Sequence, residues 1–455
     1  MFSNIIRSEQ RHGGDTVTVT DPRTLTELWP VPMATENDLD EAVQAAREAF
    51  PIWKARPLED RQQCLHRMAD ELETRQDELR PILAKESGRS DVLAKIEIDD
   101  ALRKQRLYFS FSLSLSVEYE DESVRIVFTY PPLGVVGAIC PWNFPLVLEV
   151  GKGLAALVMG NCVIVKPSPM TPYATLKFVE YTLDIRVLQA LNESNEVGAR
   201  MTTHPDIDKI SFTGSTATGR RIAESAGRSL KRVTLELGGN DASIVCADID
   251  VNEVAARVAQ GCFFHAGQMC VATKRVYVHR DVLPQFRSAF IAAVQKIVID
   301  RAAEHSPLFS PLQNRMQYQI VQDFLADSAK QVHTFSVGGP ERDGKPLPGL
   351  YISPTVVDRP PDNARIVQEE QFGPVIPILE WSDEAELIRR VNATESGLGA
   401  CVWALDVATA ERIARQLEVG TVWLNSFANP HPHGYFSGWK QSGIGGEWGR
   451  QGLLS

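Results

Sequence analysis

Apolar residues recur at helical spacing in the first hundred residues, which we therefore expect to be helical. Thr35 is placed to cap a first helix, and Pro51 is expected to end it. A second helical stretch is expected from about Leu58 to near Gly88. The apolar face of the first helix comprises Leu39, Val43, Ala46 and Phe50.

The pattern changes between about residues 112 and 128, where apolar and polar residues alternate. The runs that begin at Val117 and Val124 have the period of a strand, with one face in solvent. We therefore predict an exposed pair of strands in this segment.

From residue 133 onward, short apolar runs alternate with helical stretches. This alternation is typical of a parallel sheet covered on both faces by helices. It starts again after Gly238, so we predict an α/β chain with two doubly wound domains joined near residues 236–240. The expected strands include 133–139, 163–165, 210–212, 233–235, 243–245, 276–279, 401–404 and 421–424, and the expected helices include 174–183, 283–297 and 316–325.

Length and charge narrow the class of protein. The chain has 455 residues, 44% of them hydrophobic, which supports two or three cores rather than one. A net charge of −11 without a Lys/Arg cluster argues against a nucleic-acid partner. Segment 126–148 is uncharged, but its four prolines would break a membrane-spanning helix. We expect neither nucleic acid nor a membrane as a partner.

The seven cysteines are scattered and lack C-x-x-C spacing, which indicates reduced intracellular thiols rather than a disulfide framework. The N-terminus has no long apolar stretch behind a basic start, so we expect no signal peptide and a cytoplasmic location.

His431 and His433 lie in a proline-rich loop, and no cluster has metal-ligand spacing. We therefore expect no metal site.

Cys270 follows a Gly-Gln turn, a setting that suits an accessible nucleophile on a loop. Taken alone, the pattern fits a buried structural cysteine better, because free cysteine packs as a small hydrophobe. His265 lies five residues earlier and has the chemistry of a thiol-activating base. A surface or packing role for this histidine is the preferred interpretation.

Two further positions could act on a carbonyl group. Glu236 ends an expected strand and precedes two glycines, which allow backbone to approach a ligand. Its alternative interpretation is a solvated glutamate at a turn. Asn143 lies between Pro141 and Pro145, so its amide could be held ready to donate to an oxyanion. The alternative is a rigid loop in which the amide only bonds nearby backbone.

Residues 212–219 form a strand that runs into a glycine-hydroxyl turn and then a helix. The free N–H groups and the dipole of that helix start would attract a pyrophosphate. Arg220 and Arg221 stand where a phosphate loop of ATPases has Lys-Ser/Thr, and the G-x-G-x-x-G spacing is absent. An ordinary capped helix start is the alternative.

Taken together and in order, these motifs are similar to those of the aldehyde dehydrogenase superfamily, which the chain resembles from about residue 14 to its last residue. The motifs are Pro-Trp-Asn-Phe-Pro (141–145), Val-Lys-Pro-Ser (165–168), Phe-Thr-Gly-Ser (212–215), Glu-Leu-Gly-Gly-Asn (236–240), Gly-Gln-x-Cys (267–270), Glu-Glu-Gln-Phe-Gly-Pro (369–374) and Asn-x-x-x-x-Gly-Leu-Gly-Ala (392–400). Chance agreement on all seven is negligible.

The resemblance implies an enzyme that oxidises an aldehyde with NAD, with NADP possible, and that forms homo-oligomers. It implies a cofactor-binding domain (1–113 and 133–237), a catalytic domain (238–441) and a small β arm for oligomerisation (114–132 and 442–455). Cys270 matches the nucleophile, Glu236 the general base and Asn143 an oxyanion donor, while Lys152 and Glu447 match a proton relay. The implied cofactor contacts are Trp142, Lys166, Ser168, Gly214, Ser215, Gly219, Leu237, Glu370 and Phe372.

The implied mechanism begins with attack of the Cys270 thiolate on the aldehyde carbon, because a thiolate and not a thiol is the nucleophile. Asn143 and the backbone N–H of Cys270 then hold the oxyanion. A thioester on Cys270 follows, and water activated by Glu236 hydrolyses it.

The chain departs from the family pattern in several places. Pro169 stands where a glutamate often bonds the adenosine ribose, so NAD over NADP is only a preference. The stretch 171–191 is slightly short and lacks a Pro-Gly turn, and residues 301–306 and 435–440 replace turns that are usual in the family. The sequence stops at Ser455, before a strand that relatives pair with a partner, so we expect a homodimer rather than a tetramer.

Two other functions are weighed against hydrolytic oxidation. Transfer of the acyl group to coenzyme A is disfavoured because Glu236 is present to activate water. A catalytically impaired protein that keeps the fold for binding is disfavoured because the catalytic positions are intact. The sequence does not name the aldehyde, although aromatic residues near 144, 263–269 and 427–435 hint at a hydrophobic one.

Overall fold

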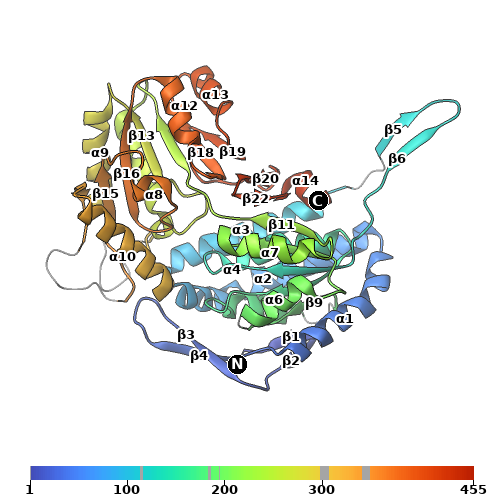
Figure 1. Cartoon of the computed structure of the whole chain (residues 1–455). Coiled ribbons are helices and arrows are strands. Elements are labelled where there is room, and N and C mark those ends of the chain that lie inside the picture. Colours follow the sequence, from blue (N-terminus) through green and yellow to red (C-terminus); the bar gives the residue numbers. More distant parts are fainter. Residues whose placement is uncertain (1, 113–115, 183–185, 194, 298–306, 341–348) are drawn as a thin grey trace.

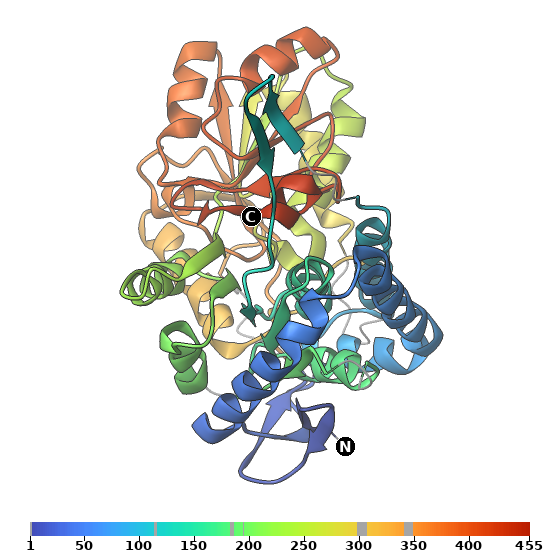
Figure 2. The ribbon, with the colours of Figure 1, turned by 90° about the vertical axis from the view of Figure 1, so that its right-hand side faces the viewer.

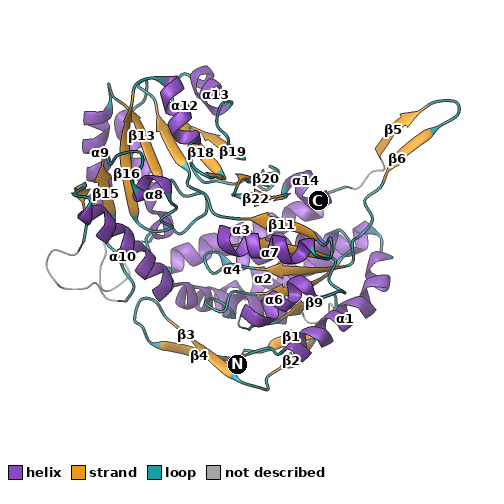
Figure 3. Ribbon diagram, in the orientation of Figure 1, coloured by secondary structure: helices purple, strands orange, loops and turns teal. Residues whose placement is uncertain are grey.

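The structure is a computed structural model, and it describes the chain except for residues 1, 113–115, 183–185, 194, 298–306 and 341–348. Two large sheets organise it (Figure 1). Helices lie on both sides of the strands of each sheet (Figure 3). The predicted α/β chain with two doubly wound units is confirmed.

The first sheet has eight strands in the order β2-β1-β9-β8-β7-β10-β11-β22. Its centre, from β9 to β11, is parallel, and β1, β2 and β22 are antiparallel additions at the edges. The strands are β1 (Asn4–Ile6), β2 (Glu9–Arg11), β7 (Val135–Ile139), β8 (Cys162–Lys166), β9 (Leu188–Ala190), β10 (Lys209–Thr213), β11 (Arg232–Glu236) and β22 (Gly443–Ile444). The helices around it are α1 (Glu36–Lys54), α2 (Leu58–Ser87), α3 (Asp91–Phe109), α4 (Pro145–Val158), α5 (Tyr173–Glu180), α6 (Asn195–Thr203) and α7 (Thr216–Gly227).

The second sheet has seven strands in the order β14-β15-β16-β13-β12-β18-β19, all parallel except for β14. The strands are β12 (Ala242–Val245), β13 (Arg275–His279), β14 (Thr334–Val337), β15 (Thr355–Asp358), β16 (Val375–Trp381), β18 (Gly399–Trp403) and β19 (Thr421–Leu424). The helices of this unit are α8 (Val251–Phe263), the short η1 (Phe264–Gly267), α9 (Leu283–Gln295), α10 (Arg315–Lys330), α11 (Arg365–Gln368), α12 (Glu384–Asn392) and α13 (Val407–Ala414). Each sheet has its own apolar core.

The last part of the chain lies between the two units (Figures 1 and 2). It contributes strands to two small antiparallel pairs and contains a short helix, and its strand β22 adds to the first sheet beside β11. These elements are β17 (Ser396–Gly397) with β21 (Trp439–Lys440), β20 (Phe436–Ser437) with β23 (Gly446–Glu447), and α14 (Gly449–Leu454).

The expected strand pair near residues 112–128 is confirmed as the hairpin β5 (Ser116–Glu120) and β6 (Arg125–Phe128). It projects away from the body of the molecule (Figure 1). Every residue of β6 is exposed, so large apolar side chains of the hairpin face solvent. They are Val117, Tyr119, Ile126, Val127 and Phe128.

The helical prediction for the first hundred residues is confirmed from Thr35 onward, except for the end of the first helix, and it is wrong before Thr35. Thr35 forms a capping box with Asp38, and α2 ends where Gly88 takes a left-handed φ of 69°. Residues 2–34 instead contain strands, including the pair β3 (Thr16–Thr20) and β4 (Glu27–Pro32). The alternating Thr and Val residues of β3 have a strand period that the helical interpretation overlooked.

Pro51 does not end the first helix, which continues to Lys54. Proline lacks the N–H that would bond the carbonyl four residues earlier. The helix therefore continues past Pro51 without that bond and ends within one further turn.

Two of the departures from the family pattern concern segments that are not fully described. Residues 183–185 of the shortened stretch 171–191 and residues 301–306 lie outside the described residues. None of the helices in the described part of the chain is long and apolar enough to cross a membrane.

Candidate active site

The three main candidate catalytic residues come from both units, two from where strands of the first sheet end and one from a loop of the second unit. Asn143 follows β7, and Glu236 is the last residue of β11. Cys270 lies between η1 and β13 of the second unit. In open α/β sheets, the carboxyl ends of the strands are the usual place for ligands.

Cys270 differs from the other cysteines of the chain. It is half-buried, whereas the other six, which also lie in the described part of the chain, are buried and unpaired. Lys274 holds its loop, because Nζ donates to the carbonyl oxygens of Cys270 at 2.7 Å and Met269 at 2.8 Å. The interpretation as a buried structural cysteine therefore loses its support.

The surroundings of Cys270 favour the protonated thiol over the thiolate. Burial raises the pKa of Cys270 to about 12, the Lys274 ammonium lowers it, and the Asp241, Glu370 and Glu236 carboxylates raise it. A nucleophilic role consequently requires a group that removes the proton, or a change of environment when ligands bind.

We expect alkylation of Cys270 by iodoacetamide to become faster with pH in the ligand-free protein. Because the raised pKa leaves little thiolate, the rate should increase about tenfold per pH unit between about pH 7 and about pH 10. Mass spectrometry of the modified peptide, with Cys270→Ala as the control, measures the rate at this site alone. A plateau that is already reached near pH 8 would contradict the raised pKa.

Asn143 is buried, and its side-chain amide crosses to the loop that carries Cys270. Nδ2 donates to the carbonyl oxygen of Gln268 at 3.0 Å. The amide thus does bond backbone, as the alternative interpretation held, but the partner lies 125 residues away rather than in its own loop. This bond brings the amide donor to the segment that carries the sulfur.

Glu236 is 4% exposed, so its interpretation as a solvated turn residue is wrong. Neither of its carboxylate oxygens has a hydrogen-bond partner among the described residues. Burial raises the pKa of Glu236 well above its ordinary value, the nearby Glu447 carboxylate adds to this, and Lys152 opposes it. A buried carboxyl group of raised pKa is suited to exchange a proton near neutral pH.

Lys152 and Glu447 form a buried ion pair beside Glu236. Ser211 also donates to Glu447, with its Oγ 3.2 Å from Oε1. Lys152 comes from α4 and Glu447 from β23, so the pair joins two segments 295 residues apart. The two residues expected to relay protons therefore contact each other and interact with the carboxyl group of Glu236.

Several of the expected cofactor contacts gather where the two units meet. The rings of Trp142 and Phe372 are edge to face at 5.4 Å. Glu370 accepts a hydrogen bond from the Gly239 N–H at 3.1 Å and lies 3.3 Å from Lys274 Nζ.

The start of helix α7 fits a pyrophosphate. Ser215 caps this twelve-residue helix by accepting from the Thr218 N–H, and both residues are exposed. Just before it, the buried hydroxyl of Thr213 has no hydrogen-bond partner among the described residues. Gly214 precedes the cap, and Gly219 is packed so closely on Leu237 that a Cβ there would overlap it. Donors without partners at a helix start suit an anionic ligand.

Lys166 and Ser168 lie at the end of β8, and no hydrogen bond in the described part of the chain joins them to the α7 start. The Ser168 hydroxyl accepts from the Met170 N–H at 3.2 Å. The ammonium of the buried Lys166 lies 3.5 Å from Oε1 of Glu193. A carboxylate therefore stands beside Lys166, although Pro169 occupies the position where the family often has one.

Sequence reasoning missed Lys274, Asp241 and Glu193 as parts of the site. Asp241 is buried and accepts from the Gly399 N–H at 3.1 Å. Burial raises the pKa of Asp241 to about 7, and Lys274 lowers it. The sequence does contain a signal for two of these residues. Asp241 directly precedes the apolar strand β12, and Lys274 directly precedes β13. Charged residues in such positions are rarely buried unless they are paired.

A comparison with family models decides the family of the chain. The model described as the aldehyde dehydrogenase family matches residues 9–455. The chain belongs to this family. This aldehyde dehydrogenase is 41% identical to the putative aldehyde dehydrogenase FUS7 of Gibberella fujikuroi, with 100% of this chain and 96% of the relative covered. It is 33% identical to retinaldehyde dehydrogenase 3 of Homo sapiens, with 99% and 91% covered.

Solved structures give the same result for this dehydrogenase. A putative aldehyde dehydrogenase from Burkholderia cenocepacia matches with a TM-score of 0.95 and 32% identity, covering 100% of this chain and 95% of that one. The NAD+ complex of an aldehyde dehydrogenase from Bacillus cereus matches with a TM-score of 0.95 and 32% identity, covering 100% and 94%. General oxidation of aldehydes is therefore the activity of the family to which this enzyme belongs.

Proposed function

We propose that this chain oxidises an aldehyde to a carboxylic acid with NAD+ through a thioester on Cys270. The observation that carries the proposal is the grouping around one half-buried sulfur. The amide of Asn143 bonds the loop of Cys270, and the buried carboxyl group of Glu236 interacts electrostatically with the thiol. A nucleophile, an amide donor and a proton acceptor in one place suit acyl chemistry.

In the first step, the Cys270 thiol gives its proton to solvent water, and Sγ of the resulting thiolate forms a bond to the aldehyde carbon as the carbonyl π bond breaks. The carbonyl oxygen becomes an oxyanion, which the Asn143 amide and the Cys270 backbone N–H stabilise. The Asn143 amide donates to the backbone carbonyl oxygen of Gln268, so it would exchange this partner for the oxyanion. Loss of one such donor typically lowers the rate about 10²- to 10³-fold.

We propose that NAD+ is held at the α7 start and between the two units. Ser215 and Gly214 would face its pyrophosphate, and Trp142, Phe372 and Glu370 would line the other end. Bound NAD+ supplies the acceptor for the hydride that leaves the aldehyde carbon. NAD+ complexes of similar enzymes support this choice of cofactor.

The Glu193 carboxylate beside Lys166 favours NAD+ over NADP+. If Lys166 contacts the adenosine ribose as the resemblance implies, this carboxylate would repel a 2′-phosphate at the same place.

In the second step, Glu236 removes a proton from water, and the water oxygen attacks the thioester carbon. The C–S bond breaks, the carboxylic acid leaves and Cys270 is restored. Lys152 and Glu447, which interact with Glu236, would carry the proton away. General-base help of this kind accounts for roughly 10²- to 10⁴-fold of the rate.

The proposal is tested by following NADH absorbance with the purified protein and a panel of aldehydes. We expect turnover with NAD+ to have a kcat/KM at least about tenfold above that with NADP+. The acid should form at the same rate with and without coenzyme A, because Glu236 activates water. A folded chain that binds NAD+ but produces no NADH with any aldehyde would favour the binding-protein alternative, and an acyl-coenzyme A product would favour acyl transfer.

We also propose the division of the chain into a cofactor-binding domain (1–113 and 133–237), a catalytic domain (238–441) and an arm (114–132 and 442–455). The apolar side chains exposed on the β5–β6 hairpin support contact of this arm with a second copy of the chain. Light scattering after size-exclusion chromatography should give the mass of at least a dimer, and a monomer at micromolar concentration would contradict the arm's role. Reduced thiols, which thioester chemistry requires, suit an intracellular site of action.

A further inference from the structure

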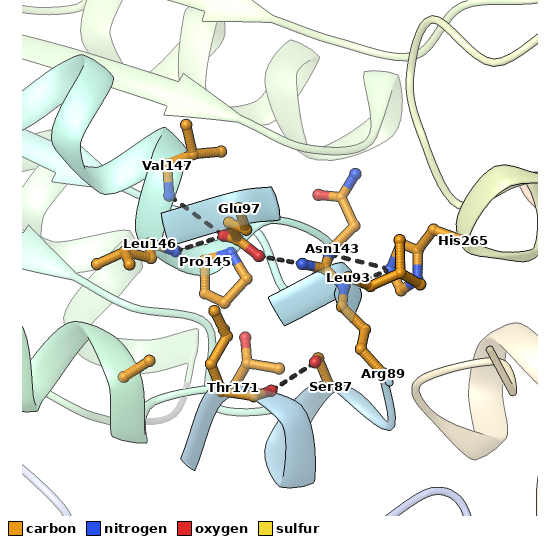
Figure 4. A network of polar contacts seen from close by, with 12 residues as sticks. Ser87, Arg89, Leu93, Glu97, Asn143, Pro145, Leu146, Val147, Thr171 and His265 are labelled. Carbon is orange, nitrogen blue, oxygen red and sulfur yellow. Dashed lines mark hydrogen bonds and ion pairs between the residues drawn. The ribbon is translucent and has the colours of Figure 1, made fainter. Parts of the chain in front are cut away.

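His265 lies at the start of the loop that carries Cys270, in a backbone conformation that few side chains adopt. Its φ is +51°, and Ala266 and Gly267 that follow also have positive φ values of 55° and 74°. The imidazole is completely buried, and both of its nitrogens have partners. Nδ1 lies 2.7 Å from Ser310 Oγ, and Nε2 lies 3.3 Å from Nε and 3.1 Å from Nη2 of Arg89 (Figure 4).

The partners determine which nitrogen carries the proton. A guanidinium has only donors, so Nε2 of His265 accepts from Arg89 and the hydrogen resides on Nδ1, which donates to Ser310. Burial lowers the pKa of His265 well below its ordinary value, and the positive charge of Arg89 lowers it further. His265 is therefore a neutral packed residue, and its one accepting nitrogen is already occupied, so it is not the base for Cys270.

Arg89 also reaches the loop that carries Asn143. Its Nη1 forms a buried ion pair with Glu97, and Glu97 Oε1 accepts from the N–H groups of Leu146 at 2.9 Å and Val147 at 3.2 Å. These N–H groups belong to the first turn of α4, where no side chain of the N-cap residue bonds them. Glu97 thus caps α4 from another helix and fixes the helix start that follows Asn143.

Phe144, the neighbour of Asn143, is held by the same side chains. The guanidinium carbon of Arg89 lies 4.2 Å from the centre of its ring, and the His265 ring meets it edge-on at 5.4 Å. The Asn143 amide is on the far side of its own backbone from Arg89 (Figure 4). Arg89 and His265 therefore contact the Asn143 loop on the side opposite to the amide. The amide can then face the loop that carries Cys270.

Gln268 completes a closed set of contacts between the two loops. The side-chain Nε2 of Gln268 donates to the backbone carbonyl oxygens of His265 and Pro311, both at 3.0 Å. The backbone carbonyl oxygen of Gln268 accepts from Asn143 Nδ2. The connection runs from Glu97 through Arg89 and His265 to Gln268, and back to Asn143. Glu97, Arg89 and Asn143 belong to the first unit. His265 and Gln268 belong to the second.

We propose that Arg89 and His265 are positioning residues that set the separation between the two oxyanion donors, the Asn143 amide and the backbone N–H of Cys270. They act through their contacts with each other and with the two loops, and not as reacting groups. The inference rests on the proposed function of Asn143. A misplacement of about 1 Å in such a donor is enough to cost about 10²-fold in rate.

The test is a double-mutant cycle on the single-turnover rate of NADH formation, with aldehyde and NAD+ at saturation. Arg89→Met alone would leave a buried carboxylate unpaired, so Glu97→Gln is introduced with it to remove both charges. We expect this pair of changes to lower the rate about 10- to 100-fold, with the Kd for NAD+ unchanged within about twofold. In an Asn143→Ala background the same changes should lower the rate by less than about threefold, because they act through Asn143.

Each outcome has a distinct meaning. An equal loss in both backgrounds would show that Arg89 acts elsewhere and would overturn the proposal, as would no loss in the chain with Asn143 intact. If Asn143→Ala alone does not slow the single turnover, the proposed oxyanion role of Asn143 is what fails.

If the Arg89→Met/Glu97→Gln chain does not fold, judged by thermal unfolding and NAD+ binding, Ser310→Ala replaces it in the same cycle. That variant removes only the partner of Nδ1, and we expect a loss of about fivefold that disappears in the Asn143→Ala background.

Discussion

Alanine in place of Cys270 is expected to lower NADH formation by about four powers of ten or more, to the limit of detection. In the proposed mechanism the sulfur of Cys270 bonds the aldehyde carbon, and a water molecule could not hold the acyl group in place of this sulfur. The six other cysteines, all described, are buried and cannot substitute. Absorbance of NADH under saturating aldehyde measures the effect, and NAD+ binding should remain.

The matched control is Cys64→Ala. Cys64 is buried in α2, and its sulfur accepts from Arg67 Nη2 at 3.1 Å, away from the candidate site. This variant should keep its turnover, apart from any loss of stability. Full activity of Cys270→Ala in the same preparation would refute the covalent mechanism.

Replacing Glu236 by glutamine should slow steady-state turnover about 10²- to 10⁴-fold while sparing the first turnover. Glutamine keeps the shape of the side chain but cannot accept a proton from water, so the thioester on Cys270 accumulates. Rapid mixing should show a burst of NADH equal to the enzyme concentration, followed by a slow phase. Mass spectrometry should find the acyl group on Cys270.

The pH dependence provides a second sign of the same role. Because the pKa of Glu236 is raised, the carboxyl group is protonated and inactive as a base below that pKa. The wild-type steady-state rate should therefore decrease as the pH falls through a value well above the ordinary one for glutamate. This decrease should be absent in Glu236→Gln.

Glu149→Gln is the matched control for this prediction. Glu149 is also buried, its oxygens have no hydrogen-bond partner among the described residues, and burial raises its pKa well above its ordinary value. Since it lies in α4 outside the proposed chemistry, its replacement should preserve both the burst and the slow phase. A burst that appears equally in both variants would remove the special role of Glu236.

Local pattern was sufficient to predict elements that contain their own start and stop signals. Thr35 with Asp38 caps α1, and Gly88 ends α2, so each boundary is encoded within a few residues. Strand β1 is different, because it joins the first sheet only through its pairing with β9, far along the chain. A three-residue strand has too little periodicity to be recognised before its partner is known.

The same distinction applies to the candidate site. Cys270, Glu236 and Asn143 lie in short motifs and could be proposed from the sequence. Arg89 and His265 could not, because they are 176 residues apart and their meaning arises only from contact. An arginine after a helix-ending glycine resembles any surface residue until folding buries it.

The pairing of β22 with β11 has a consequence for the order in which the chain can complete its fold. Residues 443–447 return to the first unit after the whole second unit has been synthesised, and they bring Glu447 to Lys152. Until these strands pair, the side chain of Lys152 lacks the carboxylate partner that it has in the finished structure. The ion pair beside Glu236 joins segments 295 residues apart, so it can form only after the second unit has been made.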